Sequence, residues 1–292
     1  MSAPKPVTSP SASGPARVRD LSALRQTIAG WRTEGQKIGF IPTMGALHEG
    51  HLALVRHAKT LSDRVVVSIF VNPLQFAPHE DFDRYPRRED ADAALLAEAG
   101  ADLVWLPDSA LMYPAGFATK IDLTGPALGL ETDFRPQFFG GVATVVTKLF
   151  NQVSPDVAIF GEKDYQQLKV VQTFARDLDM PVQVIGLPTI RETDGLALSS
   201  RNAYLSAEER DTATRLHAEM QAIAETVRAG GDADASIDRA KIRLEAAGFG
   251  PIDYIALRDA DTLAIPSGDS RALRLLAAAW LGKTRLIDNI AV

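Results

Sequence analysis

The first two thirds of the chain alternate between short apolar runs and stretches with helical spacing, and this order constrains the fold most. The expected elements are a helix over residues 21–31, a strand over Lys37–Ile41, a helix over Gly50–Thr60, a strand over Arg64–Val71, a helix over Arg88–Ala99 and a strand over Asp102–Leu106. The stretch Met112–Gly141 is expected to be irregular, and apolar residues at helical spacing predict a helix over Val142–Phe150. A further strand (Asp156–Phe160), helix (Gln166–Leu178) and strand (Val182–Gly186) follow before Pro188. Strands separated by helices predict a parallel sheet with right-handed crossovers.

The last third of the chain has a different pattern. Ser206 and Glu209 form a capping box that opens a long helix towards Arg228. A second helix and three strands are expected after it, at Ser236–Ala247, Ile252–Leu257, Ala272–Trp280 and Thr284–Ile290. Helices followed by antiparallel strands predict a separate, smaller α+β domain. The predicted organisation is a disordered leader over 1–18, an α/β parallel-sheet domain over 19–189 and the α+β domain over 190–292.

Composition excludes several classes of function. The 31 Lys and Arg against 37 Asp and Glu give a formal charge of −6, so a broad basic surface for nucleic acid is not expected. With no cysteine, the chain has no disulfide, no thiolate zinc site and no Cys nucleophile. No apolar run reaches the roughly 18 residues of a membrane span, and the Ser- and Pro-rich N-terminus resembles no secretory signal. We therefore expect a cytoplasmic protein that binds neither nucleic acid nor membrane.

The strongest chemical signal is Pro42-Thr-Met-Gly-Ala-Leu-His-Glu-Gly-His51, which directly follows the strand Lys37–Ile41. In parallel α/β sheets, ligands bind beyond the carboxyl ends of the strands. His48 and His51 are three residues apart and share one face of a helical turn, whose N-terminus favours phosphate. Two such histidines are also a metal-ligand pattern, but no third ligand lies nearby in the sequence. The position after a strand favours nucleotide phosphates.

Other strand ends carry polar blocks that belong at the same sheet edge. Asn72 and Gln75 follow the strand Arg64–Val71, although Asn72 before a proline also fits ordinary turn chemistry. The block Gly161-Glu-Lys-Asp164 follows a later strand, with Lys163 as a point charge for phosphate and Asp164 as a partner for a ribose hydroxyl or a metal ion. Alone, this block would be an exposed charged turn; its place beside the histidines favours a ligand site.

Two further segments complete the polar inventory. Ser199-Ser200-Arg201 lies at the predicted domain junction, where two hydroxyls and a guanidinium fit a phosphate clamp. Taken alone, these residues would also fit a linker with a helix cap. By contrast, His79 lies in a polar stretch and is expected to face solvent, and the mixed-charge loop of Asp81, Asp83, Arg84 and Arg87 is expected to be surface or lid.

These blocks together resemble the pantoate–β-alanine ligase family. The matching segments are Pro42–His51, Val67–Phe76, Gly140–Asn151, Phe160–Gln167, Pro188–Tyr204 and Thr284–Ile290. The HxGH pattern alone marks a wider nucleotidyl-transfer superfamily, and the later blocks narrow the resemblance. It implies a Rossmann-like first domain, a C-terminal lid domain and a homodimer. It also implies a reaction that joins pantoate and β-alanine at the expense of ATP, with Mg²⁺.

The resemblance also implies roles for individual positions. Catalytic roles fall to His48, His51, Lys163, Ser199, Ser200 and Arg201. ATP is expected to contact Met44, Gly45, Ala46, Leu47, His48, Glu49, Gly50, His51, Gly161, Glu162, Lys163, Asp164, Ile190, Leu198, Ser199, Ser200 and Arg201. Pantoate or β-alanine is expected to contact Asn72, Gln75, Val145, Val146 and Gln167. No dedicated metal site is expected; Mg²⁺ would arrive with ATP, with Asp164 as the candidate ligand.

Two other functions share parts of this pattern. A nucleotidylyltransferase acting on a phosphate-bearing acceptor would also use HxGH, but its acceptor site would need basic residues where this chain has Asn72 and Gln75. An RNA-interacting protein of the aminoacyl-tRNA synthetase type, or an inactive ATP sensor, is the third hypothesis. The acidic charge argues against RNA. An inactive relative would be expected to lack one of the charged or imidazole groups that are all present here.

Overall fold

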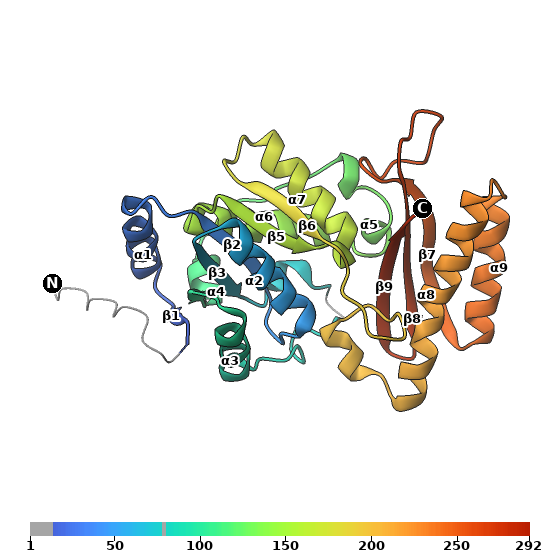
Figure 1. Cartoon of the computed structure of the whole chain (residues 1–292), viewed down its shortest axis with the longest axis horizontal. Coiled ribbons are helices and arrows are strands. Elements are labelled where there is room, and N and C mark those ends of the chain that lie inside the picture. Colours follow the sequence, from blue (N-terminus) through green and yellow to red (C-terminus); the bar gives the residue numbers. More distant parts are fainter. Residues whose placement is uncertain (1–13, 78–79) are drawn as a thin grey trace. The chain divides into compact units, whose positions relative to one another are not determined.

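The computed structural model describes residues 14–77 and 80–292, which form two compact units (Figure 1). Unit 1 runs through Asp122 and adds Gln137–Phe160 and Val171–Leu187. Unit 2 consists of Leu123–Pro136, Gly161–Val170 and Pro188–Val292. Leu123–Pro136 and Gly161–Val170, which the sequence analysis assigned to the parallel-sheet domain, therefore group with the C-terminal part, because they pack on its sheet. Within the described residues, no helix combines the length and apolarity that a membrane crossing requires.

Unit 1 is built on a six-stranded sheet whose order is β1-β4-β3-β2-β5-β6. Its strands are β1 (Ala16–Val18), β2 (Ile38–Thr43), β3 (Arg64–Ile69), β4 (Leu103–Trp105), β5 (Val157–Gly161) and β6 (Gln183–Leu187). The pairings from β1 to β5 are all parallel. The predicted Rossmann-like parallel sheet is confirmed, and its carboxyl edge is where the polar blocks after β2 and β3 begin.

Helices cover both faces of this sheet. They are α1 (Leu21–Thr33), α2 (Glu49–Leu61), α3 (Glu89–Ala99), the short α4 (Ser109–Met112), α6 (Phe138–Val153) and the latter part of α7 (Tyr165–Asp177). On one face, Val65 and Val67 of β3 join a buried cluster with residues of α2 and α3. On the other, Phe40 of β2 meets Phe150 of α6 edge to face, with ring centroids 6.3 Å apart. The alternation of side chains along each strand buries both faces.

Three predicted boundaries in unit 1 were wrong. Regular structure begins before residue 19: β1 lies inside the predicted leader and pairs with β4 as an edge strand of the sheet. The rest of that leader, residues 1–13, and His79 lie outside the described residues. Pro42 does not close the strand: β2 continues to Thr43, and Pro42 pairs with Ser68. The region 112–141 is not wholly irregular, because α6 starts at Phe138, where Gly140 and Gly141 obscure the helical pattern.

Gly141 shows why that helix tolerates glycine. A Cβ at this position would lie 2.2 Å from the carbonyl oxygen of Leu74. Leu74 belongs to η1 (Pro73–Gln75), a single 3-10 turn that follows β3. The glycine therefore lets the backbone of η1 approach α6 closely, which any larger residue would prevent.

Unit 2 is a three-stranded antiparallel sheet of order β7-β8-β9, with helices on one face and loop segments on the other. Its elements are η2 (Gly125–Ala127), α5 (Glu131–Phe134), η3 (Glu162–Asp164), η4 (Ser200–Tyr204), α8 (Ala207–Arg228), α9 (Ala233–Ala246), β7 (Phe249–Asp259), β8 (Leu273–Leu281) and β9 (Thr284–Ala291). Apolar residues of α8 and α9 form one core with alternate residues of the sheet. Leu130, Tyr165 and Leu263 pack with Leu276 on the opposite face.

The expected start of α8 is confirmed in atomic detail. Ser206 accepts the amide hydrogen of Glu209, and Glu209 accepts that of Ser206 through its carboxylate. Both contacts are local, so the sequence alone specifies where this helix begins.

Candidate functional site

The histidine motif forms a turn with unusual backbone geometry after β2. Thr43 donates its hydroxyl hydrogen to the carbonyl of Ser68 on β3 and accepts the amide hydrogen of Gly45. Gly45 has a φ of +83°, and Ala46 has a φ of +51°. A non-glycine residue in this region is disfavoured, so contacts elsewhere must hold the turn.

Those contacts come from a buried carboxylate that the sequence analysis missed. Asp92 of α3 accepts the amide hydrogens of Ala46 and Leu47, both at 2.9 Å, and is only 2% exposed. Burial raises the pKa of Asp92, against the opposing effect of these two amides. A signal was present: Asp92 shares the buried side of α3 with Leu96 and Ala99, at i, i+4 and i+7. A carboxylate on an apolar helix face requires partners.

His48 and His51 cap the helix α2 with their own side chains. Nδ1 of His48 accepts the amide hydrogen of Gly50 at 3.2 Å, and Nδ1 of His51 accepts that of His48 at 3.4 Å. The two rings lie 4.2 Å apart between centroids. An accepting Nδ1 carries no proton, so each neutral imidazole carries its proton on Nε2. The helix end thus holds two imidazole donors.

This geometry refines the predicted role of the helix N-terminus. The amides of Gly50 and His51 bond within the turn, the first to an imidazole and the second to the carbonyl of His48. The expected phosphate donors at these two positions are therefore the imidazole Nε2–H groups, rather than unpartnered backbone amides.

The second polar block lies after β3 and also belongs to unit 1. Asn72 is 1% exposed and caps η1 by accepting the amide hydrogen of Leu74. Its Nδ2 donates to Oε1 of Gln75 at 3.1 Å, and Nε2 of Gln75 donates to the sulfur of Met44 at 3.1 Å. The structure therefore brings Met44, Asn72 and Gln75 together. The bond from the Leu74 amide agrees with the predicted turn role of Asn72, and the bond from Nδ2 of Asn72 orients Gln75.

Val145 and Val146 lie on α6 in the same unit and are 6% and 4% exposed. Their apolar surfaces belong to the packed interior around this helix. Valine side chains form no hydrogen bonds, so in substrate binding these two residues would form an apolar wall.

In unit 2, the predicted Gly-Glu-Lys-Asp block forms η3, and β9 holds it in place. The side-chain amide of Asn289 donates to the carbonyls of Glu162 and Lys163, both at 2.8 Å. Arg274 of β8 donates to Oδ1 of Asn289 and to Oε2 of Glu162. The Lys163 side chain is 20% exposed, with Nζ 4.0 Å from a carboxylate oxygen of Asp164. Glu162 is thus engaged by Arg274, while Lys163 is positioned through its backbone.

The Ser-Ser-Arg block follows a short hairpin. In it, Arg191 and Ala197 form an antiparallel β-bridge, and Leu198 donates its amide hydrogen to the carbonyl of Ile190. Ser199 then caps η4 by accepting the amide hydrogen of Arg201. The predicted residues Ile190, Leu198, Ser199, Ser200 and Arg201 therefore lie on one continuous folded segment.

That hairpin is also tied to β9. Arg191 makes two hydrogen bonds to the buried carboxylate of Asp288, at 2.7 and 2.8 Å. Burial opposes ionisation of Asp288, but the contacts from His217 and Arg191 outweigh it and hold its pKa below the usual value. Asp288 and Asn289 are neighbours on a strand, so their side chains project to opposite faces. One pair of residues thereby anchors both predicted ATP segments of unit 2, and sequence reasoning did not assign either residue.

Two adjacent glutamines at the start of α7 have different surroundings. Gln166 is buried, accepts the amide hydrogen of Glu131 and donates to the carbonyls of Pro126 and Gly129. Gln167, the residue predicted to bind substrate, is half-buried. Within unit 2, Gln166 therefore ties the 123–136 segment to the start of α7, and Gln167 is left as the candidate for ligand contact.

Within the described residues, no group of three or more His, Asp or Glu side chains is arranged to hold a metal ion. Asp164 is the predicted Mg²⁺ ligand, and its side chain is 47% exposed beside Lys163. A partly exposed carboxylate of this kind fits an ion that keeps several waters and binds mainly to substrate phosphates.

Comparisons with known proteins match this chain along nearly its whole length. The family described as Pantoate-beta-alanine ligase matches residues 16–291. Pantothenate synthetase of Caulobacter vibrioides is 55% identical over 282 residues, which cover 95% of this chain and 99% of that protein. Pantothenate synthetase of Rhodopseudomonas palustris is 57% identical over 280 residues, covering 95% and 99%.

Solved structures agree. A crystal structure of pantothenate synthetase from Thermus thermophilus gives a TM-score of 0.88 at 46% identity, covering 94% of this chain and 98% of that one. Pantoate-beta-alanine ligase from Francisella tularensis, complexed with beta-gamma ATP and beta-alanine, gives a TM-score of 0.80 at 32% identity, covering 95% and 97%.

Proposed function

The chain belongs to the pantoate–β-alanine ligase family, and we propose which of its residues carry out each half of the ATP-dependent condensation of pantoate with β-alanine. The observation that supports this assignment best is the paired imidazoles at the start of α2, whose Nδ1 atoms are engaged by the backbone. Their Nε2–H groups are donors suited to phosphate oxygens.

In the first half-reaction, pantoate is activated. A carboxylate is a poor electrophile, so its oxygen first attacks the α-phosphorus of ATP, the bond to the bridging oxygen breaks, and pyrophosphate leaves. The carboxylate is already ionised, and no general base is needed. What the reaction needs is positioning and donors for the charge that develops on the departing oxygens.

We assign those donors to residues that the structure holds firmly. His48 and His51 donate through Nε2 to the phosphates. Lys163, fixed through its carbonyl by Asn289, is assigned the positive charge, and Ser199, Ser200 and Arg201 are assigned to ATP as a phosphate clamp. The remaining ATP contacts are Met44, Gly45, Ala46, Leu47, Glu49, Gly50, Gly161, Glu162, Asp164, Ile190 and Leu198.

Pantoate is a small hydroxy acid, so its site needs uncharged hydrogen-bonding groups and an apolar wall. Gln75 and Gln167 are assigned to its oxygens, with Asn72 supporting Gln75 and with Val145 and Val146 as wall residues. A phosphate-bearing acceptor would need cations here, and the block after β3 offers amides. This contrast favours the ligase over a nucleotidylyltransferase.

In the second half-reaction, the amine of β-alanine attacks the acyl carbon of pantoyl adenylate, and AMP leaves with the bonding electrons of the acyl–oxygen bond. The amine must lose a proton; a histidine at the site, the departing AMP and water are the candidate acceptors. The adenylate needs no covalent enzyme nucleophile, which agrees with a chain that has no cysteine.

Mg²⁺ and a partner subunit complete the proposal. Asp164 fits a magnesium ion that is held mainly by ATP phosphates, where the ion would offset phosphate charge. We also propose a homodimer on the family resemblance; light scattering coupled to size exclusion would measure its mass.

The decisive experiment is ATP–pyrophosphate exchange with Mg²⁺ and pantoate, in the absence of β-alanine. Exchange that depends on pantoate is expected, and the variant His51→Ala should lose most of it. A folded protein that binds ATP but shows no pantoate-dependent exchange would overturn the adenylate mechanism.

A further inference from the structure

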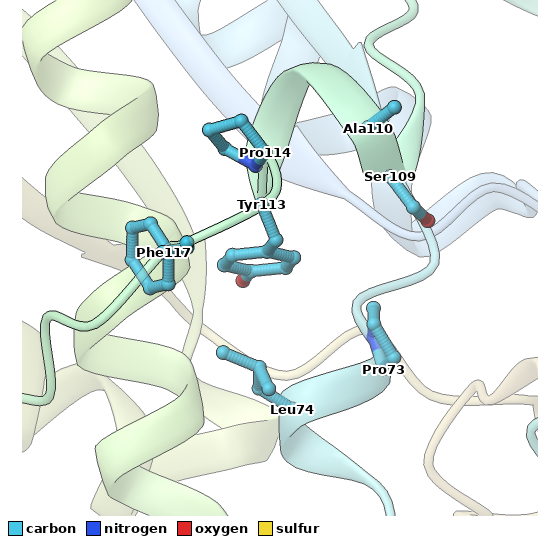
Figure 2. Close-up of a pocket in the computed structure, with 8 residues that line it drawn as sticks. Pro73, Leu74, Ser109, Ala110, Tyr113, Pro114 and Phe117 are labelled. Atoms are coloured by element: carbon cyan, nitrogen blue, oxygen red, sulfur yellow. The ribbon is translucent and has the colours of Figure 1, made fainter.

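Tyr113 contacts the polar block after β3, and none of the roles proposed above involves it. It follows the short helix α4, and its hydroxyl donates to Oδ1 of Asn72 at 2.6 Å. Figure 2 shows its ring between Phe117 and the η1 residues Pro73 and Leu74, at a hollow of about 490 Å³. All of these residues belong to unit 1.

The hydrogen bonds of Asn72 give this contact a direction. Its Oδ1 accepts from Tyr113 and from the amide of Leu74, so this end of the amide faces two donors. Its Nδ2 donates to Oε1 of Gln75 and to the carbonyl of Gly141, so the other end faces two acceptors. Reversing the amide would set its –NH₂ against the amide N–H of Leu74 and its oxygen against the carbonyl of Gly141, and the Tyr113 hydroxyl would have to accept instead of donate. This is costly at a site that is 1% exposed.

The direction continues to the next side chain. Since Oε1 of Gln75 accepts from Asn72, its –NH₂ group lies at the opposite end, where it donates to the sulfur of Met44 at 3.1 Å. A thioether is a weak acceptor. A carboxylate or hydroxyl oxygen of a ligand at this end would form a stronger hydrogen bond.

We propose that Tyr113 is a positioning residue that acts through Asn72 to fix the amide of Gln75 with its –NH₂ end towards pantoate. The inference rests on the proposed role of Gln75 in pantoate binding. It adds a reason why this site suits a substrate with a carboxylate: with the amide reversed, its oxygen would face carboxylate oxygens, which accept hydrogen bonds but cannot donate them.

The surroundings of Tyr113 suit a fixed donor. Its ring packs edge to face on Phe117, with centroids 5.2 Å apart, and lies 6.2 Å from Phe70. Burial raises the pKa of the Tyr113 hydroxyl well above its usual value, so it remains protonated at physiological pH. The ring fixes the position of the hydroxyl, and protonation allows it to donate to Asn72.

The first test is Tyr113→Phe, which removes the hydroxyl and keeps the ring. We expect the pantoate KM to rise about fivefold, the factor that one hydrogen bond of about 1 kcal/mol carries, while the KM for ATP changes less than about twofold. The assay is pantoate-dependent ATP–pyrophosphate exchange over a matrix of both substrate concentrations.

A double-mutant cycle separates positioning from packing. Without the Gln75 side chain, the direction of its amide no longer matters. Adding Tyr113→Phe to a Gln75→Ala background should therefore leave the pantoate KM unchanged. Phe117→Leu is the matched control, because it alters the ring packing around Tyr113 and retains the hydroxyl; its pantoate KM should equal that of the wild type.

A second variant tests direction from the middle of the chain of hydrogen bonds. Asn72→Asp retains acceptors for Tyr113 and Leu74 but removes the donor to Gln75, which would then turn its –NH₂ inward. Its pantoate KM should rise more than that of Tyr113→Phe, and Gln75→Ala should remove most of the difference.

The outcomes distinguish the two levels of the proposal. If the wild-type exchange does not depend on pantoate, or if Gln75→Ala leaves the pantoate KM unchanged, the proposed function of Gln75 fails. If both are as expected but Tyr113→Phe has a normal pantoate KM, or has the same effect in both backgrounds, the positioning role of Tyr113 is overturned.

Discussion

Replacing Asp92 with Asn tests how the histidine turn is held. The two carboxylate oxygens accept one amide hydrogen each, from Ala46 and Leu47. An Asn side chain has one oxygen, so its –NH₂ group would face one of these amides. A buried amide left without an acceptor costs about 1–3 kcal/mol, and burying a neutral side chain in place of an ion offsets part of this. We expect a net loss of about 2 kcal/mol in the free energy of unfolding.

The assay combines thermal unfolding with ATP–pyrophosphate exchange. For a unit of this size, about 2 kcal/mol corresponds to a fall in Tm of roughly 4–8 °C. The exchange rate should fall as well, because the strained turn at Ala46 leads directly into His48. Asp90→Asn is the matched control on the same helix, since the Asp90 side chain is 93% exposed; its Tm should stay within about 1 °C of the wild type. An Asp92→Asn variant with wild-type Tm and exchange rate would refute this account of the turn.

Four further predictions concern single side chains. His51→Ala should lower turnover by about 10²-fold or more with the fold intact by circular dichroism, and near-normal turnover would remove it from the mechanism. Gln75→Ala should raise the pantoate KM more than the ATP KM in initial-rate assays; the reverse would place it elsewhere. Asn289→Ala should raise the ATP KM, because the loop that carries Lys163 loses two hydrogen bonds, and an unchanged ATP KM would contradict that link. Folding lowers the pKa of Asp288, so its contribution to stability is present above the unfolded pKa near 3.9 and is lost as the pH falls through the folded pKa. The difference in free energy of unfolding between the wild type and Asp288→Asn, measured by urea unfolding, should therefore shrink in acid. A difference that grew in acid would contradict the ion-pair account.

The order of elements and the local motifs were predictable because adjacent residues determine them. The β-branched run at Arg64 forms β3, and the capping box at Ser206 starts α8. The place of the histidines after a buried strand also followed from contiguous sequence. The start of α6 was missed because Gly140 and Gly141 carry no apolar signal. Gly141 is required because the backbone of Leu74 packs too closely for a Cβ atom.

The supports of the candidate site could not be predicted in the same way. Asp92 is 46 positions from Ala46, Tyr113 is 41 from Asn72, and Asn289 is 126 from Lys163. Each sequence segment shows that a polar group must find a partner, but not which one. The sequence by itself therefore determined the fold class and the reactive groups, since hydrophobic period and turn chemistry act over a few residues. Only the tertiary structure decided how those groups are held, because hydrogen bonds between distant segments exist only once the chain has packed.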